Sequence, residues 1–429
     1  MKNLILLIAC FPILLFGQGW EKTYENGVGF SVQQTSDGGY VITGYTYNSN
    51  NESRDIYLIK TDSYGDTLWI RTYGDSFTDV GYSVQQTIDG GYVIAGSTDL
   101  DNSGTNVDIC LIKTDSNGDI EWTKNYGGDY FDIGQSVQQT SDGGYVITGY
   151  SGSYSPTTDI ILIKTDSQGD TAWVKSYDLG WDDKGYSVQQ TSDHGYIITG
   201  KCYPLNYFSY DLFLIKTDSL GDTLWMKTVG NQYDHIGYAV QQTSDGGYIV
   251  TGTHVINTSF SDIILLKTDE NGVTTWTKTY GDDFYYDIGH SVQETLDNGY
   301  IIIGFTNSNN YSNNYSIYLM KTDSNGDTLW TKTYGGNYSI YGYSGQQTSD
   351  GGYIITGRKN NGNEDYIILI KTNESGIITS TTEIPISFTS RKLVRKVDLF
   401  GREILNPPKN KPYIEIYDDG TTQKKMRTE

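Results

Sequence analysis

The amino-acid sequence predicts an all-β protein: a seven-bladed β-propeller with four antiparallel strands per blade, a ring closed by an N-terminal strand, and a small β C-terminal tail. Three observations lead to this prediction. One unit occurs seven times, each copy contains four strand-like runs, and a strand pattern missing from the last copy stands before the first. No window has the sustained periodicity of a helix.

Two blocks define the repeat. The first reads Ser31-Val-Gln-Gln-Thr-Ser-Asp-Gly-Gly-Tyr40, and the second reads Ile56-Tyr-Leu-Ile-Lys-Thr-Asp62. The first block begins again at Ser83, Ser136, Ser187, Ala239, Ser291 and Ser344, at intervals of 51 to 53 residues. The lysine of the second block recurs at Lys60, Lys113, Lys164, Lys216, Lys267, Lys321 and Lys371. Both blocks are therefore present seven times.

Each unit contains four short strands. In the first unit we expect them at residues 32–35, 40–44, 56–61 and 67–73. The second strand, Tyr40-Val-Ile-Thr-Gly44, is rich in aromatic and β-branched residues. The turn before it, Ser36-Asp37-Gly38-Gly39, supplies residues that tolerate the positive φ of a tight hairpin. Four antiparallel strands per unit are typical of a propeller blade.

The ends of the repeat region favour a closed ring over a linear solenoid. The segment Trp20-Glu-Lys-Thr-Tyr24 precedes the first unit and matches the fourth strands of the others. Their tryptophans are Trp69, Trp122, Trp173, Trp225, Trp276 and Trp330. The seventh unit ends without such a tryptophan, so the N-terminal strand can complete the last blade and cover its open edge.

Composition restricts the classes of partner. The formal net charge of −22 disfavours nucleic acid and anionic membranes, because both are bound through clustered Lys and Arg. Cations, neutral glycans and basic proteins are compatible with an acidic surface. Cys110 and Cys202 stand where sister repeats carry other residues, so we expect unlinked, partly buried thiols and no disulfide framework.

The chain divides into three predicted parts: a signal peptide at 1–19, the propeller at 20–380 and a C-terminal domain at 381–429. Lys2 followed by an apolar run to Phe16 is typical of a cleaved secretion signal and is short for a membrane span. No later stretch is apolar enough for a transmembrane segment. We therefore expect a secreted protein or one on the outer cell surface.

The two repeat blocks resemble propeller repeats of proteins exported by Bacteroidetes-type bacteria, over roughly residues 20 to 380. This resemblance implies architecture and says little about activity. The turn Asp115-Ser-Asn-Gly118 with Trp122 also resembles the tryptophan-docking motif of pyrroloquinoline-quinone dehydrogenases and, loosely, the sialidase Asp-box. In both families the motif ties neighbouring blades together, which implies a structural role for Trp69 and its equivalents.

The C-terminal residues differ in charge from the repeats. From Arg391 onward there are ten Lys or Arg against six Asp or Glu. The segments Lys396-Val-Asp-Leu-Phe-Gly-Arg-Glu403 and Tyr413-Ile-Glu-Ile-Tyr417 resemble a shortened type IX secretion (type A) C-terminal sorting domain. The resemblance implies that residues 391–429 engage the secretion machinery. The alternative is an ordinary two-strand extension.

Acidic and aromatic residues recur where the first strand of each unit begins. Asp79, Asp132, Asp183 and Asp287 each stand two residues before a glycine, and the residues after that glycine are Phe30, Tyr82, Gln135, Tyr186, Tyr238, His290 and Tyr343. We predict a ligand site at the pore mouth from the four aspartates with Tyr82, Tyr186, Tyr238 and His290, suited to a sugar or to a cation such as Ca²⁺. The alternative, favoured by the repetition, is that each aspartate caps its own turn.

No catalytic or metal-binding motif stands out. The four histidines lack metal-ligand spacing, and no Gly-x-Ser-x-Gly is present. We therefore predict no catalytic residues, no metal site and no cofactor beyond the Ca²⁺ considered above. The leading hypothesis is a non-catalytic binding or scaffold module for a glycan or a surface protein, on the face with variable loops. The alternative is a hydrolase or lyase acting on polysaccharides from the same face.

Overall fold

A computed structural model describes most of the repeat region and parts of the C-terminal region. The described residues are 19–48, 53–101, 103–154, 157–205, 209–257, 260–281, 284–308, 314–378, 393–397, 402, 404, 412–417 and 422–426. They are arranged in strands and turns without a helix, so this part of the chain is all-β, as predicted. Among them there is consequently no helix of the length and apolar character that crossing a membrane requires. Of the predicted signal peptide, only Gly19 is described.

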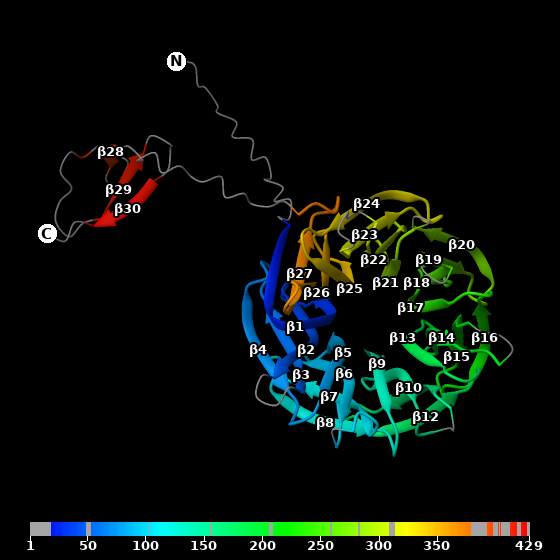
Figure 1. Cartoon of the computed structure of the whole chain (residues 1–429). Coiled ribbons are helices and arrows are strands. Elements are labelled where there is room, and N and C mark those ends of the chain that lie inside the picture. Colours follow the sequence, from blue (N-terminus) through cyan, green and yellow to red (C-terminus); the bar gives the residue numbers. More distant parts are fainter. Residues whose placement is uncertain are drawn as a thin grey trace. The chain divides into compact units, whose positions relative to one another are not determined.

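The strands follow the repeat, with four in each of the first six units and three in the seventh (Figure 1). The first strands are β1 (Trp20–Gln34), β5 (Asp79–Gln86), β9 (Asp132–Gln139), β13 (Lys184–Gln190), β17 (His235–Gln242), β21 (Asp287–Glu294) and β25 (Ser339–Gln347). The second strands are β2 (Tyr40–Asn48), β6 (Tyr92–Asp99), β10 (Tyr145–Ser151), β14 (Tyr196–Cys202), β18 (Tyr248–Asn257), β22 (Tyr300–Thr306) and β26 (Tyr353–Asn360). The third strands are β3 (Ser53–Thr61), β7 (Val107–Thr114), β11 (Asp159–Thr165), β15 (Asp211–Thr217), β19 (Phe260–Thr268), β23 (Ser316–Thr322) and β27 (Asp365–Thr372). The fourth strands are β4 (Thr67–Tyr73), β8 (Ile120–Tyr126), β12 (Thr171–Tyr177), β16 (Thr223–Val229), β20 (Thr274–Tyr280) and β24 (Thr328–Tyr334).

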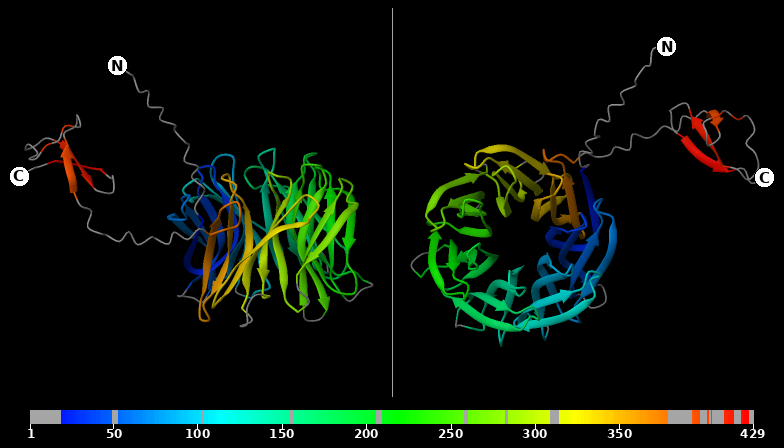
Figure 2. Two further views of the ribbon diagram at one scale, coloured as in Figure 1. Left: turned by 90° about the horizontal axis from the view of Figure 1, so that it is seen from above. Right: turned by 180° about the vertical axis from the view of Figure 1, so that it is seen from behind.

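The sheets stand around a common centre like the blades of a propeller, with the first strands innermost (Figures 1 and 2). Five sheets have four antiparallel strands each, and one sheet has seven, in the order β25-β26-β27-β1-β2-β3-β4. The apolar core lies between neighbouring sheets. Val93 and Leu111 of one sheet, for example, share a buried cluster with Tyr145 and Ile161 of the next.

Strand β1 belongs to two groups of strands. Its residues Trp20 to Asn26 pair with β27, and its residues Gly27 to Gln34 pair with β2. The sequence predicts a separate N-terminal strand at Trp20–Tyr24 and a first strand beginning near Val32, whereas the structure joins them into one strand of 15 residues. The expected pairing of the N-terminal segment with the seventh unit is confirmed.

The repeated glutamines and serines connect the innermost strands around the centre. The backbone N–H of Gln86 donates to the side-chain oxygen of Gln33 in the preceding unit, and the N–H of Val84 donates to the hydroxyl of Ser31. The series closes on itself, because the N–H of Val32 donates to the hydroxyl of Ser344, 312 residues away. These side chains bridge strands that share no backbone ladder, which explains why they repeat.

The repeated tryptophan ties each outer strand to the next sheet. The ring of Trp69 lies 5.8 Å from that of Tyr92, and it covers Gly118 so closely that a Cβ there would stand 2.8 Å from the indole. Trp20 takes the same position over Gly65, with its ring 5.8 Å from that of Tyr40. The structural role implied by the resemblance is therefore confirmed.

The repeated lysine is buried and forms an ion pair with the turn after the first strand. Lys60 is 4% exposed, and its ammonium group donates to the Asp37 carboxylate and to the carbonyl of Thr61. Asp37 also accepts hydrogen bonds from the Thr35 hydroxyl and the Gly39 N–H. The turn block and the lysine block thus form one hydrogen-bonded unit in each repeat.

The chain separates into two compact units, 1–379 and 380–429. In the second, β28 (Leu393–Val397), β29 (Pro412–Tyr417) and β30 (Thr422–Met426) form a three-stranded antiparallel sheet. This is one strand more than the simple extension considered for this region. In the first unit, Cys110 and Cys202 are unlinked as expected, but they are 2% and 0% exposed, so both thiols are buried rather than partly buried.

Candidate functional site

The two faces of the propeller differ in how constant their residues are. Because the strands run antiparallel, the turns after the first and third strands share one face, and the joining loops share the other with the loops between strands two and three. The first face carries the repeated turns, whereas the second, called here the variable face, carries the loops that differ between units. Binding residues on a rigid scaffold are commonly carried by such variable loops.

A β-bulge occurs near the variable face in every first strand. In β1, Gly29 pairs with Gly44 and Ser31 pairs with Thr43, so Phe30 is skipped. The same shift occurs in the other six first strands. A bulge leaves one residue out of the ladder and redirects its side chain. The bulged residues, called here the bulge ring, are Phe30, Tyr82, Gln135, Tyr186, Tyr238, His290 and Tyr343.

Glycine makes the bulge sterically feasible. A Cβ on Gly44 would stand 1.8 Å from the carbonyl oxygen of Val28 on the paired strand. Only glycine tolerates such a close backbone approach. The equivalent glycines in the other second strands are equally restricted; at Gly252 the corresponding distance, to the carbonyl oxygen of Ile236, is 1.7 Å.

The bulge ring brings together aromatic side chains from distant parts of the chain. Tyr186 stacks on Tyr238 at 5.5 Å between ring centroids, and Tyr238 lies 4.6 Å from His290. Phe30 lies 5.4 Å from Tyr82 and also 5.4 Å from Tyr343, which closes the arc across the chain ends. His290 lies 5.3 Å from Tyr343. The aromatic series is interrupted at Gln135.

A second ring of variable residues accompanies the first. It consists of the residue after the second-strand glycine in each unit: Tyr45, Ser97, Tyr150, Lys201, Thr253, Phe305 and Arg358. Tyr45 lies 5.8 Å from Phe30, and Phe305 lies 5.4 Å from His290, so members of the two rings contact each other within a unit. This position was not predicted from the sequence. Its signal was available, because the preceding residues of each second strand are nearly constant while this one changes from Tyr to Ser, Lys, Thr, Phe and Arg.

The predicted aspartates do not join the aromatic residues. Asp79, Asp132, Asp183 and Asp287 are buried, between 0% and 4% exposed, and lie where one sheet meets the preceding one. Asp79 accepts a hydrogen bond from the N–H of Asp75 in its own joining loop, and Asp132 accepts one from the N–H of Gly128. Of the predicted site residues, the structure therefore groups Tyr186, Tyr238 and His290, places Tyr82 beside Phe30, and holds the four aspartates at separate junctions.

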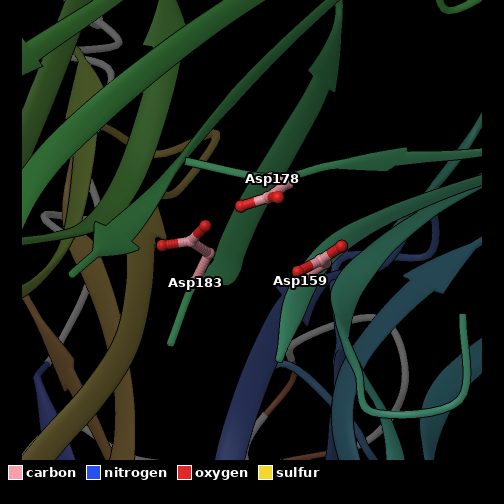
Figure 3. Close-up of side chains that lie close together, drawn as sticks. All are labelled: Asp159, Asp178 and Asp183. Carbon is pink, nitrogen blue, oxygen red and sulfur yellow. The ribbon is translucent and has the colours of Figure 1, made fainter. Parts of the chain in front are cut away.

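One junction contains three carboxylates (Figure 3). Asp159, Asp178 and Asp183 each have an oxygen within 4.8 Å of the others, and no other such group of metal-ligating side chains is found in the part of the chain that the structure describes. Asp183 accepts from the N–H of Leu179 and Asp159 accepts from the hydroxyl of Ser176. Carboxylate oxygens are ligands of the kind that Ca²⁺ takes, and Asp183 is the member of this group that belongs to the predicted site.

Burial shifts the pKa values of the predicted aspartates and of the bulge-ring residues. It raises the pKa of Asp79 and of Asp183 to about 6, against several hydrogen bonds that lower it. It lowers the pKa of His290 to about 4, so this imidazole is neutral at pH 7. Burial also raises the pKa of Tyr186 and Tyr238, so these phenols stay protonated and can donate hydrogen bonds.

No protein-family model matches the sequence, and no curated protein matches it either. Among solved structures, YCF48 bound to D1 peptide is 10% identical, covers 85% of this chain and 99% of its own, and has a TM-score of 0.50. Polysaccharide lyase Uly1 is 13% identical, with 81% and 90% covered and a TM-score of 0.48. The β-propeller domain of the Trilobed protease from Pyrococcus furiosus is 9% identical, with 85% and 98% covered and a TM-score of 0.45. The similarity to YCF48 supports the propeller fold alone.

Proposed function

We propose that this protein is a non-catalytic binding module that engages a glycan through the two rings on its variable face. The observation that carries the proposal is that the residues that differ between units lie at two positions on this face. In each unit the turns and strands repeat, while the bulge position and the position after the second-strand glycine change. The two positions are in ring contact in the first unit, through Phe30 and Tyr45, and in the sixth, through His290 and Phe305. Six of the seven bulge residues are aromatic, counting His290, and aromatic rings with polar edges suit the faces of sugars.

The repeated residues support a scaffold role for the rest of the ring. Ser31, Gln33, Lys60 and Trp69 all have structural partners in their own or the neighbouring unit. We propose seven blades, with β1 shared between the last and the first. Two observations support this count: the seven occurrences of each block, and the change of partner along β1 between Asn26 and Gly27.

We further propose that the chain is exported by type IX secretion and acts outside the cell or on its outer surface. The support is the N-terminal apolar run and the basic C-terminal segments that resemble a sorting domain. Cell fractionation of a strain whose chain ends at residue 380 tests this, with the full chain as control. Retention of the shortened chain inside the outer membrane is expected. Unchanged export of the shortened chain would contradict the role of the tail.

A glycan array probed with the full chain, followed by calorimetry on the best ligand, tests the binding function. Replacing Tyr186 and Tyr238 by alanine should weaken binding about tenfold or more, since stacked aromatics dominate such contacts. The control is Tyr64→Ala, because this tyrosine is 70% exposed on the opposite face. Equal loss in both proteins, or no binding to any glycan, would contradict the proposal and leave a protein partner or a structural role.

A second candidate function is a hydrolase or lyase acting on polysaccharides. The observation that favours it is His290, a neutral imidazole whose ring lies between Tyr238 and Tyr343 at 4.6 and 5.3 Å. Histidine is the side chain that most often acts as a general acid or base in enzymes. Turnover of a polysaccharide by the full chain that His290→Gln abolishes, with binding retained, would favour this candidate over the first.

A further inference from the structure

A groove opens between the fifth and sixth units on the face that carries the repeated turns, called here the turn face. Its volume is about 760 Å³, within the range of about 300 to 1,000 Å³ that ligand sites have. Trp276 and Tyr300 line it, with their rings 6.0 Å apart. A second groove, of about 430 Å³, shares Ser244, Glu294 and Asn298 with the first and reaches the seventh unit. The continuous hollow suits an extended ligand.

The groove itself follows from the repeat, but some of its residues do not. A groove of about 560 Å³ lies in the same position between the second and third units, where it is lined by Trp122 and Tyr145. Between the fifth and sixth units, Glu294 stands where the six other units carry glutamine, and Glu270 stands where five units carry serine. Asn298 stands where five units carry glycine. These replacements break the symmetry of the turn face at one groove.

Glu294 carries a charge that its turn does not require. In other units the glutamine side-chain oxygen accepts a hydrogen bond from a turn N–H of the preceding unit, as Gln86 does from Ser36 at 2.8 Å. Glu294 accepts the same bond from the N–H of Ser244 at 2.7 Å, and a second from the Ser244 hydroxyl at 2.9 Å. Both donors are neutral. Because an amide serves this turn in six units, the negative charge of Glu294 is additional to the structural need.

The charges that line this groove do not balance. Its lysine, Lys267, pairs with Asp245 at 2.9 Å. Asp269 also lines the groove and accepts hydrogen bonds from backbone N–H groups of its own turn. None of the ion pairs formed by the described residues involves Glu270 or Glu294. One cation therefore stands against four carboxylates, and the groove has a net negative charge.

The remaining polar lining of the groove consists of amides and hydroxyls. They belong to Asn271, Asn298, Asn325, Ser244 and Ser324. Amide and hydroxyl groups both donate and accept hydrogen bonds, as the hydroxyls of a sugar require of their partners. A lysine-rich peptide is matched less well, because its ammonium groups only donate. The half-buried Trp276 adds an aromatic surface of the kind that packs against sugar rings.

We propose that the turn-face groove between the fifth and sixth units binds a chain of amino sugars, whose free ammonium groups contact Glu270 and Glu294. The site lies on the face opposite the variable face and goes beyond the function proposed above. The net charge of −22 attracts a cationic sugar chain to the molecule as a whole. The two additional carboxylates, together with the amides and hydroxyls, select this groove from the others.

Calorimetry with the full chain tests the assignment. The probes are glucosamine oligosaccharides, N-acetylglucosamine oligosaccharides of the same length, and oligolysine, at a pH where the amines are protonated and the carboxylates ionised. The two sugar probes share a backbone and differ in charge. We expect the glucosamine chain to bind at least about tenfold more tightly than the acetylated chain. Its binding should weaken as the salt concentration rises.

The variant is E270S/E294Q, which introduces the residues that most sister units carry at these positions. It should weaken binding of the glucosamine chain at least about tenfold. The matched control is E374S, because Glu374 occupies the position of Glu270 in the seventh unit, whose neighbouring first strand carries Gln34 in place of a glutamate. The control should stay within about twofold of the wild type. Thermal unfolding identifies a double variant that fails to fold, in which case E294Q alone replaces it.

Three results would overturn the inference in distinguishable ways. Equal effects of E270S/E294Q and E374S would show that the net charge of the molecule, rather than this groove, attracts the chain. Equal affinity for the acetylated chain would remove the role of the carboxylates. Oligolysine bound as tightly, with the same loss in the double variant, would replace the sugar by a basic protein segment. Replacing Tyr186 and Tyr238 should leave this binding unchanged, so the variable-face function is tested separately.

Discussion

The Tyr73 hydroxyl donates a 2.7 Å hydrogen bond to the carbonyl of Gly118, at the turn of the next sheet. The same bond recurs in other units, for example from Tyr126 to Gly169 and from Tyr177 to Gly221. Gly118 has a φ of 79° and lies under the indole of Trp69. Gly118 thus adopts a left-handed backbone conformation, accepts a hydrogen bond through its carbonyl and leaves room for the indole ring. This junction between sheets depends on all three properties.

Gly118→Ala should destabilise the protein more than Gly90→Ala. Both glycines have positive φ, 79° and 87°, so both substitutions carry a backbone penalty of about 1 to 2 kcal/mol. Only at Gly118 would the new methyl group stand 2.8 Å from the Trp69 ring, whereas nothing lies within 4 Å at Gly90. The additional overpacking should cost about 1 to 3 kcal/mol. Urea midpoints at constant slope measure the difference, and equal midpoints would show that the indole moves away freely.

Trp20→Ala should destabilise the ring as much as an internal tryptophan substitution, by about 3 kcal/mol. The reason is that Trp20 closes the last junction, with its ring on Tyr40 and Gly65. Trp181→Ala is the control, since this tryptophan is 63% exposed and should change the free energy of unfolding by less than about 0.5 kcal/mol. If Trp20→Ala behaved like the control, the ring would not depend on this strand for closure.

The protein should lose stability steeply below pH 4. Burial by itself would raise the pKa of Asp37, but hydrogen bonds from Lys60, Thr35 and Gly39 outweigh it and lower this pKa to about 2. A lowered carboxyl pKa contributes stability that is present above the unfolded value near 4 and is lost as the pH falls to 2. The same lowering to about 2 occurs at Asp142, Asp193, Asp245 and Asp297.

Urea unfolding between pH 2 and 5 measures this loss. Lys60→Met, which removes the buried cation of one unit, should reduce the steepness of the decline. An unchanged slope in this variant would indicate that the lysines do not hold the aspartates ionised.

Asp79→Asn should have the opposite pH dependence. Burial raises the pKa of Asp79 to about 6, so the folded state binds a proton between pH 4 and 6 that the unfolded state does not. The ionised carboxylate therefore costs stability above pH 6, by at most about 3 kcal/mol for a shift of this size. The asparagine variant should be more stable than the wild type at pH 8 and lose that advantage near pH 4. Lower stability at both pH values would show that the carboxylate is needed for its hydrogen bonds to the loop.

Much of the architecture could be predicted from the repeat. The glycine-containing turn, the β-branched second strand and the outer tryptophan are local signals, and seven copies reinforce each of them. The main difference between the prediction and the structure concerns residues 20–34, which were expected to form two strands and form one. Residues 20–34 form one strand although they contain Asn26-Gly27, a common turn pair. The presence of β27 beside their first half and of β2 beside their second keeps the chain extended at this point.

The candidate site was only partly predictable. The structure places Tyr186, Tyr238 and His290 side by side, whereas the aspartates, three residues before the bulge position, were expected beside them and lie at the sheet junctions instead. In these units the aspartate stands three residues before the bulged residue, and residues at an odd spacing in a strand point to opposite faces. Their common place at the mouth of the first strand therefore does not bring the two sets together.

By itself, the sequence determined the unit, its strands, the turns that join them and the pairing of the first and last repeats, since these follow from local conformational preference and from the period of the chain. Only the tertiary structure decided which side chains meet at the variable face. Those contacts join residues such as Phe30 and Tyr343, more than 300 positions apart, and closing the ring is what brings them within 5.4 Å.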